Sequence, residues 1–80
     1  MPTIYRQDGF EVMIYTNDHR PAHVHTFKAE AEVIINLSTG TAPPSVRTNI
    51  NMGRTDERRA LIIVAEHDDA FWVEWKRIHG

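Results

Sequence analysis

The chain has 80 residues, of which 41% are apolar and 25% charged, and it carries a formal charge of −2 at neutral pH. This length supports one domain with a modest core, and the composition is that of a folded protein rather than a disordered tail. The absence of cysteine excludes disulfides, thiolate metal ligands and thiol nucleophiles, and the net negative charge argues against nucleic-acid binding over the whole surface.

The first 37 residues predict an antiparallel sheet of three or four strands. Apolar-rich segments occupy residues 3–6, 10–15, 23–27 and 30–37, with polar, glycine- or proline-containing segments between several of them. In the second segment Phe10, Val12 and Ile14 alternate with other residues, so they share one face of the strand. In the fourth segment residues 33–35 are consecutive apolar residues, which predicts burial on both faces.

The next segment, residues 38–54, is expected to be a long connecting loop. It contains two prolines and two glycines and shows no sustained periodicity. Connectors of this length are often functional or mobile. We expect Val46, Ile50 and Met52 to attach part of the segment to the core.

Residues 55–79 predict helical structure. Thr55 is the expected N-cap, followed by acidic residues that complement the helix dipole. One straight helix over residues 56–79 would be about 36 Å long, whereas a domain of this size is only about 30 Å across. We therefore expect a bend or a second helix start near Asp68, or an overhang that packs on a partner. The apolar residues that share one helical face are Leu61, Val64, Phe71, Trp75 and Ile78.

Together these segments predict one α+β domain over residues 1–80. The sheet lies in residues 1–37, the loop in 38–54 and the helical part in 55–79, with one or two C-terminal helices packed on one face of the sheet. The N-terminal segment does not resemble a signal peptide, and the longest apolar run, residues 61–65, is far shorter than the roughly 20 residues that span a bilayer. We expect a cytoplasmic location and no membrane partner.

The segment Asp18-His19-Arg20-Pro21-Ala22-His23-Val24-His25 holds the candidate catalytic or metal-binding residues. In a strand that begins at His23, His23 and His25 point to the same face, while Pro21 keeps His19 outside the sheet. Together with Asp18, the three imidazoles form a candidate ligand set for a divalent transition metal, although the sequence makes no cofactor certain. Alternatively, these residues stabilise the loop through hydrogen bonds or line a protein interface.

Two further features are candidates for binding. Four arginines in the loop and the first helical turns are the best candidates for binding an anion or nucleic acid, although a solvated face offset by Asp56 and Glu57 is the slightly favoured interpretation. Trp72 lies about 60° from Trp75 around the helix, so it is a candidate interface residue or one edge of a wide apolar face. The four arginines are Arg47, Arg54, Arg58 and Arg59.

These residues resemble the bacterial family known as domain of unknown function 4160. The resemblance rests on the Asp-His-x-Pro-x-His-x-His motif of residues 18–25, on the opening Met1-Pro2-Thr3-Ile4, and on Trp75 in the C-terminal part. The chain departs from the family pattern over residues 38–54 and at Ala22, where a second proline is common. The resemblance implies a partner protein, action on nucleic acid, and a role of the toxin–antitoxin type.

Three functions follow as hypotheses. The first is a binding module, a toxin–antitoxin-type or regulatory component that contacts a small protein partner or a second copy of itself, and in addition RNA or DNA. The second is a metal-dependent hydrolase or nuclease, in which the histidines hold the metal, Asp18 ligates or orients, and Arg58 and Arg59 hold a phosphate. The third is metal-free acid–base chemistry by the pair His23 and His25.

Overall fold

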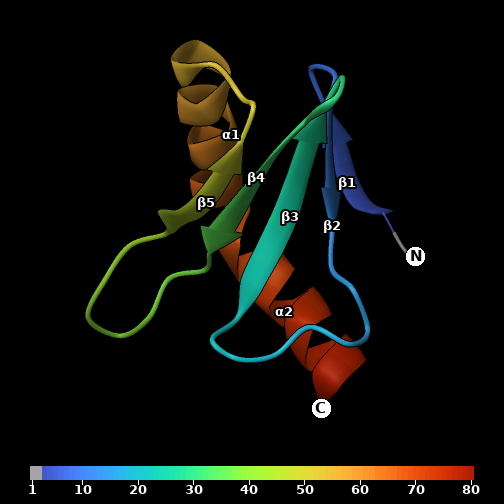
Figure 1. Cartoon of the computed structure of the whole chain (residues 1–80). Helices are drawn as coiled ribbons and strands as arrows, with labels where there is room; N and C mark the ends of the chain where they lie inside the picture. Colours follow the sequence, from blue (N-terminus) through green and yellow to red (C-terminus); the bar gives the residue numbers. More distant parts are fainter. Residues whose placement is uncertain (1–2) are drawn as a thin grey trace.

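The computed structural model describes residues 3–80, which form a five-stranded antiparallel sheet followed by two helices (Figure 1). This arrangement confirms the predicted α+β fold. The opening Met1-Pro2 lies outside the described residues. The strands are β1 (Thr3–Gln7), β2 (Phe10–Met13), β3 (His23–Lys28), β4 (Ala31–Asn36) and β5 (Ser45–Ile50), and the helices are α1 (Arg54–Glu66) and α2 (Asp68–His79).

The strands lie in the sheet in the order of the sequence, and each pairs antiparallel with the next. The β1–β2 hairpin turns at Asp8 and Gly9, whose φ angles of 54° and 84° are both positive. Two positive φ angles are typical of the tight turns that match the twist of paired strands, and glycine adopts them without strain. The Asp-Gly pair in the sequence therefore accounts for the first hairpin.

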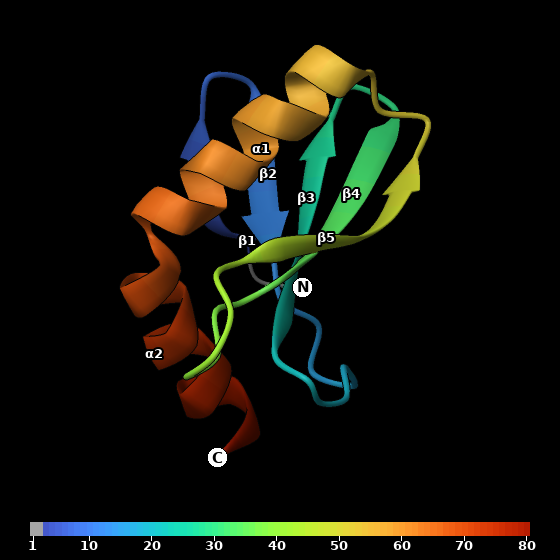
Figure 2. The same ribbon diagram turned by 90° about the vertical axis from the view of Figure 1, so that its left-hand side faces the viewer.

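Both helices cover the same face of the sheet, and the core lies between the two layers (Figure 2). Phe10, Val12 and Ile14 are buried as their alternation predicts. On the two central strands Val24 pairs with Ile35 and continues the same buried face. The opposite face of the sheet has no helix among residues 3–80, so Ile34 is only half-buried, contrary to the expectation of burial on both faces.

The strand β5 corrects the prediction of a continuous loop over residues 38–54 and raises the strand count to five. Its residues Val46, Thr48 and Ile50 alternate at the strand period, and all three have β-branched side chains, which favour strands. The strand lies at an edge of the sheet and most of its side chains are exposed. An exposed edge strand needs no continuous apolar face, so its sequence signal is weak.

The expected break in the helical region is present, because α1 ends at Glu66 and α2 begins at Asp68. The predicted N-cap at Thr55 is wrong: the cap is Gly53, two residues earlier, and α1 begins at Arg54. The Gly53 carbonyl accepts the Glu57 N–H at 2.8 Å. Within residues 3–80 no helix combines the length and apolar character needed to cross a membrane.

The two neighbouring isoleucines of α1 test this packing. Ile63 is fully buried, whereas 48% of Ile62 is exposed. We expect Ile63→Ala to lower the free energy of unfolding by about 2–5 kcal/mol, since it removes buried methylene groups and leaves a cavity. Ile62→Ala, the matched control, should cost less than about 1 kcal/mol. Chemical denaturation followed by circular dichroism measures both, and equal losses would contradict the described orientation of α1.

Candidate functional site

The side chains of His23 and His25 are held in place by the first half of β3. Both residues are buried, with 5% and 9% of their surface exposed. The loop of residues 14–22, which connects β2 to β3, brings Asp18 against them. This loop is closed by two hydrogen bonds, because the Asp18 N–H donates to the Tyr15 carbonyl at 3.1 Å and the Tyr15 N–H donates to the Asp18 carboxylate at 3.0 Å.

The Asp18 carboxylate lies between the two imidazoles. Its Oδ1 atom is 3.4 Å from Nε2 of His23 and 3.1 Å from Nε2 of His25. Candidate ligand atoms of these three residues all lie within 4.8 Å of one another. We call Asp18, His23 and His25 the triad. Its residues are drawn from one strand and the loop that precedes it, so their mutual placement depends on the conformation of that loop.

The other ring nitrogen of each histidine has its own oxygen partner. Nδ1 of His23 lies 2.9 Å from the Pro21 carbonyl, and Nδ1 of His25 lies 2.8 Å from Oε2 of Glu32 on β4. A carbonyl oxygen only accepts, so Nδ1 of His23 carries the proton and donates it. When the His23 ring is neutral, its Nε2 atom is therefore an acceptor that faces a carboxylate oxygen.

Electrostatics around the triad favour an ionised Asp18. Burial alone would raise the pKa of Asp18, but the hydrogen bond from the Tyr15 N–H and the nearby His25 and His23 rings hold it below its ordinary value. Burial also raises the pKa of the Tyr15 hydroxyl, and the Glu32 and Asp18 carboxylates raise it further. The Tyr15 ring packs edge-on against the His25 ring at 4.5 Å between centroids.

The structure brings together three of the four residues predicted as metal ligands. His19 is exposed and is not part of the group of potential ligands formed within residues 3–80. Glu32, which the sequence did not indicate, contacts His25 because the β3–β4 register pairs Phe27 with Glu32 and places Glu32 diagonally across from His25. The register of the hairpin is the signal that would have identified it.

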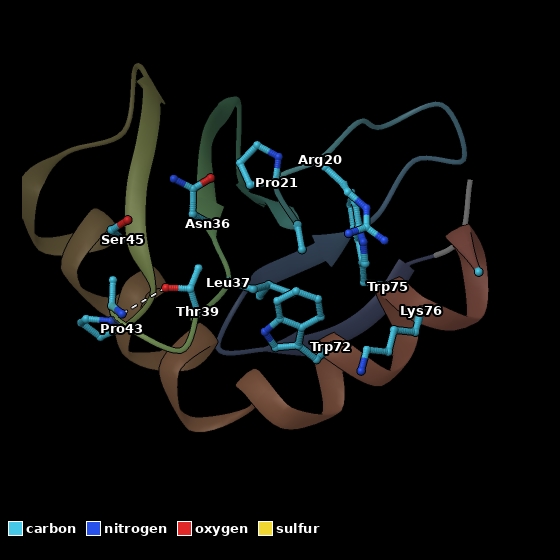
Figure 3. Close-up of a pocket in the computed structure, with 13 residues that line it drawn as sticks. Arg20, Pro21, Asn36, Leu37, Thr39, Pro43, Ser45, Trp72, Trp75 and Lys76 are labelled. Atoms are coloured by element: carbon cyan, nitrogen blue, oxygen red, sulfur yellow. Dashed lines mark hydrogen bonds between the residues drawn. The ribbon is translucent and has the colours of Figure 1, made fainter.

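A second feature is a groove with a cavity volume of about 810 Å³, whose lining residues are drawn in Figure 3. Its walls come from the loop of residues 14–22, the end of β4, the segment before β5, and α2. Trp72 and Trp75 supply aromatic surface, while Arg20 and Lys76 supply positive charge. The lining residues are Arg20, Pro21, Ala22, Asn36, Leu37, Thr39, Ala42, Pro43, Ser45, Trp72, Trp75, Lys76 and Gly80.

Trp72, predicted as an interface residue, is half-buried in this groove. Its Nε1 atom donates to the Ser38 carbonyl at 2.9 Å, which fixes the orientation of the indole. Ser38 is itself held by Asp68, whose carboxylate accepts both its N–H, at 2.9 Å, and its hydroxyl. The Lys76 ammonium lies 5.8 Å from the centre of the Trp72 ring, close enough for a cation–π contact.

The groove and the triad share a wall. Trp75 lines the groove, and its ring centroid is 5.4 Å from that of His23. Pro21 also lines the groove, and its carbonyl accepts hydrogen bonds from His23 and from Arg47, the latter at 3.0 Å. A change in the position of either residue would therefore affect both sites.

The four predicted anion-binding arginines do not form one site. Arg47 lies on β5, where it donates to the Asn36 side chain at 2.8 Å and to Pro21. Arg54, Arg58 and Arg59 are exposed on α1, and Arg59 approaches the carboxylate of Asp8 at 3.9 Å. The sequence grouped Arg47 with the helical arginines because they are close in the chain, but its contacts belong to the wall between the groove and the triad.

Comparison with known proteins identifies the family. The model of the family described as a domain of unknown function (DUF4160) matches residues 9–76 of the chain. Neither the curated proteins nor the solved structures yield a match. The chain belongs to this family, as the motif of residues 18–25 suggested.

The lowered pKa of Asp18 predicts how stability depends on pH. The pKa of Asp18 is lower in the folded chain than in the unfolded chain, where it lies near 4. The ionised carboxylate therefore stabilises the fold at pH values above about 4. This contribution to the free energy of unfolding is lost as the pH falls through the pKa of the folded chain. We expect Asp18→Asn to lower the free energy of unfolding by about 1–3 kcal/mol at neutral pH in the presence of a chelator. This loss should become progressively smaller as the pH falls.

Denaturant unfolding of the wild type and of Asp18→Asn, from neutral pH into acid, measures the two free energies of unfolding. Asp69→Asn, the same substitution at an exposed position on α2, is the control. It should lower the free energy of unfolding by less than about 1 kcal/mol, because it removes a negative charge that interacts favourably with the helix dipole. If the difference in free energy of unfolding between the wild type and Asp18→Asn does not change with pH, the described contacts of Asp18 are contradicted.

Proposed function

We propose that this member of the family is a binding module that recognises an acidic, apolar segment of a partner protein. The observation that carries the proposal is the groove, whose aromatic base and cationic rim lie next to each other. Pockets of roughly 300–1,000 Å³ lined mainly by apolar and aromatic side chains are the usual form of a small-molecule site, and the side chains that dominate protein interfaces are likewise buried in well-packed pockets. Tryptophan and arginine are also the residues that most often carry interface binding energy.

The groove is already organised for binding. Trp72 is fixed by its hydrogen bond to Ser38, and Ser38 is fixed by Asp68. On the opposite side the Pro21 carbonyl is held by His23 and Arg47. A surface whose side chains are ordered before the partner arrives loses little conformational entropy on binding, which favours affinity.

The charge of the groove favours an acidic partner. Arg20 and Lys76 both contribute to the lining, and no Asp or Glu side chain does so within residues 3–80. An apolar side chain of the partner would occupy the space beside Trp72 and Trp75, while neighbouring carboxylates would face the two cations. Complementary charge of this kind raises the rate of association and helps exclude unsuitable partners.

A protein partner suits these features better than RNA or DNA. The chain carries a formal charge of −2, and nucleic-acid binding depends on many cations that neutralise phosphates. Three of the four predicted arginines lie on α1, outside the lining of the groove. A toxin–antitoxin-type pair, as the family resemblance implies, would provide such a protein partner.

A display experiment tests this proposal. A library of random peptides is selected on the intact wild-type chain, and we expect enrichment of peptides that combine an apolar or aromatic residue with Asp or Glu. Lys76→Glu and Arg20→Glu should each weaken the best peptide about tenfold, since each reverses one favourable charge. Fluorescence anisotropy of the labelled peptide measures these affinities.

Arg58→Glu is the matched control, because it makes the same charge change at an exposed position on α1 away from the groove. It should leave the peptide affinity within about twofold of the wild type. Selection of no peptide, or equal weakening by Arg58→Glu, would contradict the groove as the recognition site. If the groove binds single-stranded RNA or DNA in preference to peptides, the partner is a nucleic acid and the proposal of a protein partner is wrong.

A further inference from the structure

The contact between His23 and Asp18 requires a positive charge. Because Nδ1 of His23 donates to the Pro21 carbonyl, Nε2 of the neutral ring presents a lone pair to Oδ1 of Asp18, 3.4 Å away. Two acceptors that face each other in a buried position repel unless a proton or a metal cation lies between them. The same Asp18 oxygen lies 3.1 Å from Nε2 of His25, so one cation could serve both contacts.

We infer that Asp18, His23 and His25 together bind one divalent first-row transition metal. This inference rests on the contacts of the triad alone and not on the proposed recognition of a partner in the groove. The two Nε2 atoms and one carboxylate oxygen are the protein ligands, and they leave at least one coordination position for water or another ligand.

The separations of the donor atoms fit a shared metal. Two donors bound at about 2.0–2.1 Å lie roughly 3–3.4 Å apart when the angle at the metal is between a right angle and the tetrahedral angle. The two Asp18–His separations of 3.4 Å and 3.1 Å lie at or within these limits. The candidate ligand atoms of the two histidines lie within 4.8 Å of each other, and two donors on one metal are at most about 4.2 Å apart, so the two imidazoles would approach each other when the metal binds.

The hydrogen bonds behind the triad also fit a metal site. A metal-bound histidine usually donates its other ring N–H to a carbonyl or carboxylate oxygen, which fixes the tautomer and the ring orientation. Pro21 provides the carbonyl for His23, and Glu32 provides the carboxylate for His25. With both rings neutral, the charges of Asp18 and Glu32 amount to two negative charges, which one divalent cation balances.

The donor types limit the choice of metal. Imidazole nitrogen with one carboxylate suits zinc, cobalt, nickel and iron, whereas calcium and magnesium prefer sites made of oxygen ligands. The lack of cysteine in the sequence excludes a thiolate site. A bound metal with an open position is what the predicted hydrolase would require, and hydrolysis itself stays a prediction.

The experiment uses the full chain without an affinity tag, freed of metal by a chelator and then titrated with zinc in competition with a fluorescent zinc indicator. We expect one zinc per chain and a higher melting temperature when zinc is present. His23→Gln, His25→Gln and Asp18→Asn should each remove the high-affinity site. Glu32→Gln should weaken it by roughly 10–100-fold, because Glu32 orients His25 without contacting the metal.

His19→Gln is the control, since His19 lies in the same loop but is exposed and outside the triad. It should bind zinc as the wild type does. Because substitution of a buried histidine can prevent folding, the visible absorption of the cobalt-loaded wild type provides a second measurement, and we expect the bands of a nitrogen- and oxygen-ligated ion.

Three results would overturn the inference. The first is a folded wild type that binds neither zinc nor cobalt, which would mean that a proton holds the triad together. The second is zinc binding lost in His19→Gln but kept in the triad variants, which would indicate adventitious chelation at the surface. The third is a cobalt spectrum of the wild type identical to that of the fully hydrated ion.

Discussion

The arrangement of the two candidate sites depends on the contact between the Asp18 carboxylate and the two imidazoles of β3. Nε2 of His23 and Nε2 of His25 both face the same carboxylate oxygen, at 3.4 Å and 3.1 Å. This contact places the loop of residues 14–22 against the sheet, and the loop in turn supplies one wall of the groove. A proton or a metal cation at the contact would remove the repulsion between the two acceptors and so favour this position of the loop.

Because Pro21 lines the groove and its carbonyl accepts the hydrogen bond from His23, and because Trp75 lines the groove and packs against His23, a change at one site would affect the other. A ligand that binds only the folded triad stabilises the loop, and a stabilised loop keeps the groove wall in place. The same linkage acts in the other direction, since a partner bound in the groove would hold Pro21 where His23 needs its carbonyl. The family motif of residues 18–25 thus contains the residues of the triad together with the groove residues Arg20, Pro21 and Ala22.

Much of the fold follows from short-range patterns. The alternation of Phe10, Val12 and Ile14 placed the core face of the sheet, and the length of residues 56–79 against the size of the domain indicated a break near Asp68 as one of the alternatives. β5 was missed because an exposed edge strand has no apolar face to reveal it. The Thr55 cap was misplaced because glycine and threonine have similar preferences for this position, so the sequence alone did not distinguish Gly53 from Thr55.

The candidate site was predictable only in part, for a physical reason. His23 and His25 share a strand face by the period of two, and that relation needs no tertiary information. Glu32 and Arg47 reach their partners across strand registers, and the groove is assembled from four separate segments, so neither could be derived from spacing along the chain. The exposure of His19 depends on the conformation of the loop, which the sequence motif does not determine.

Long-range proton–nitrogen NMR of the imidazole rings, recorded during a zinc titration of the intact chain, tests the central claim most directly. The account predicts that the Nε2 resonances of His23 and His25 move to the range of metal-bound nitrogen while Nδ1 of both rings stays protonated, and that His19 does not change. If Nε2 of both rings keeps the signature of a protonated nitrogen throughout the titration, a proton and not a metal holds the triad, and the account is contradicted.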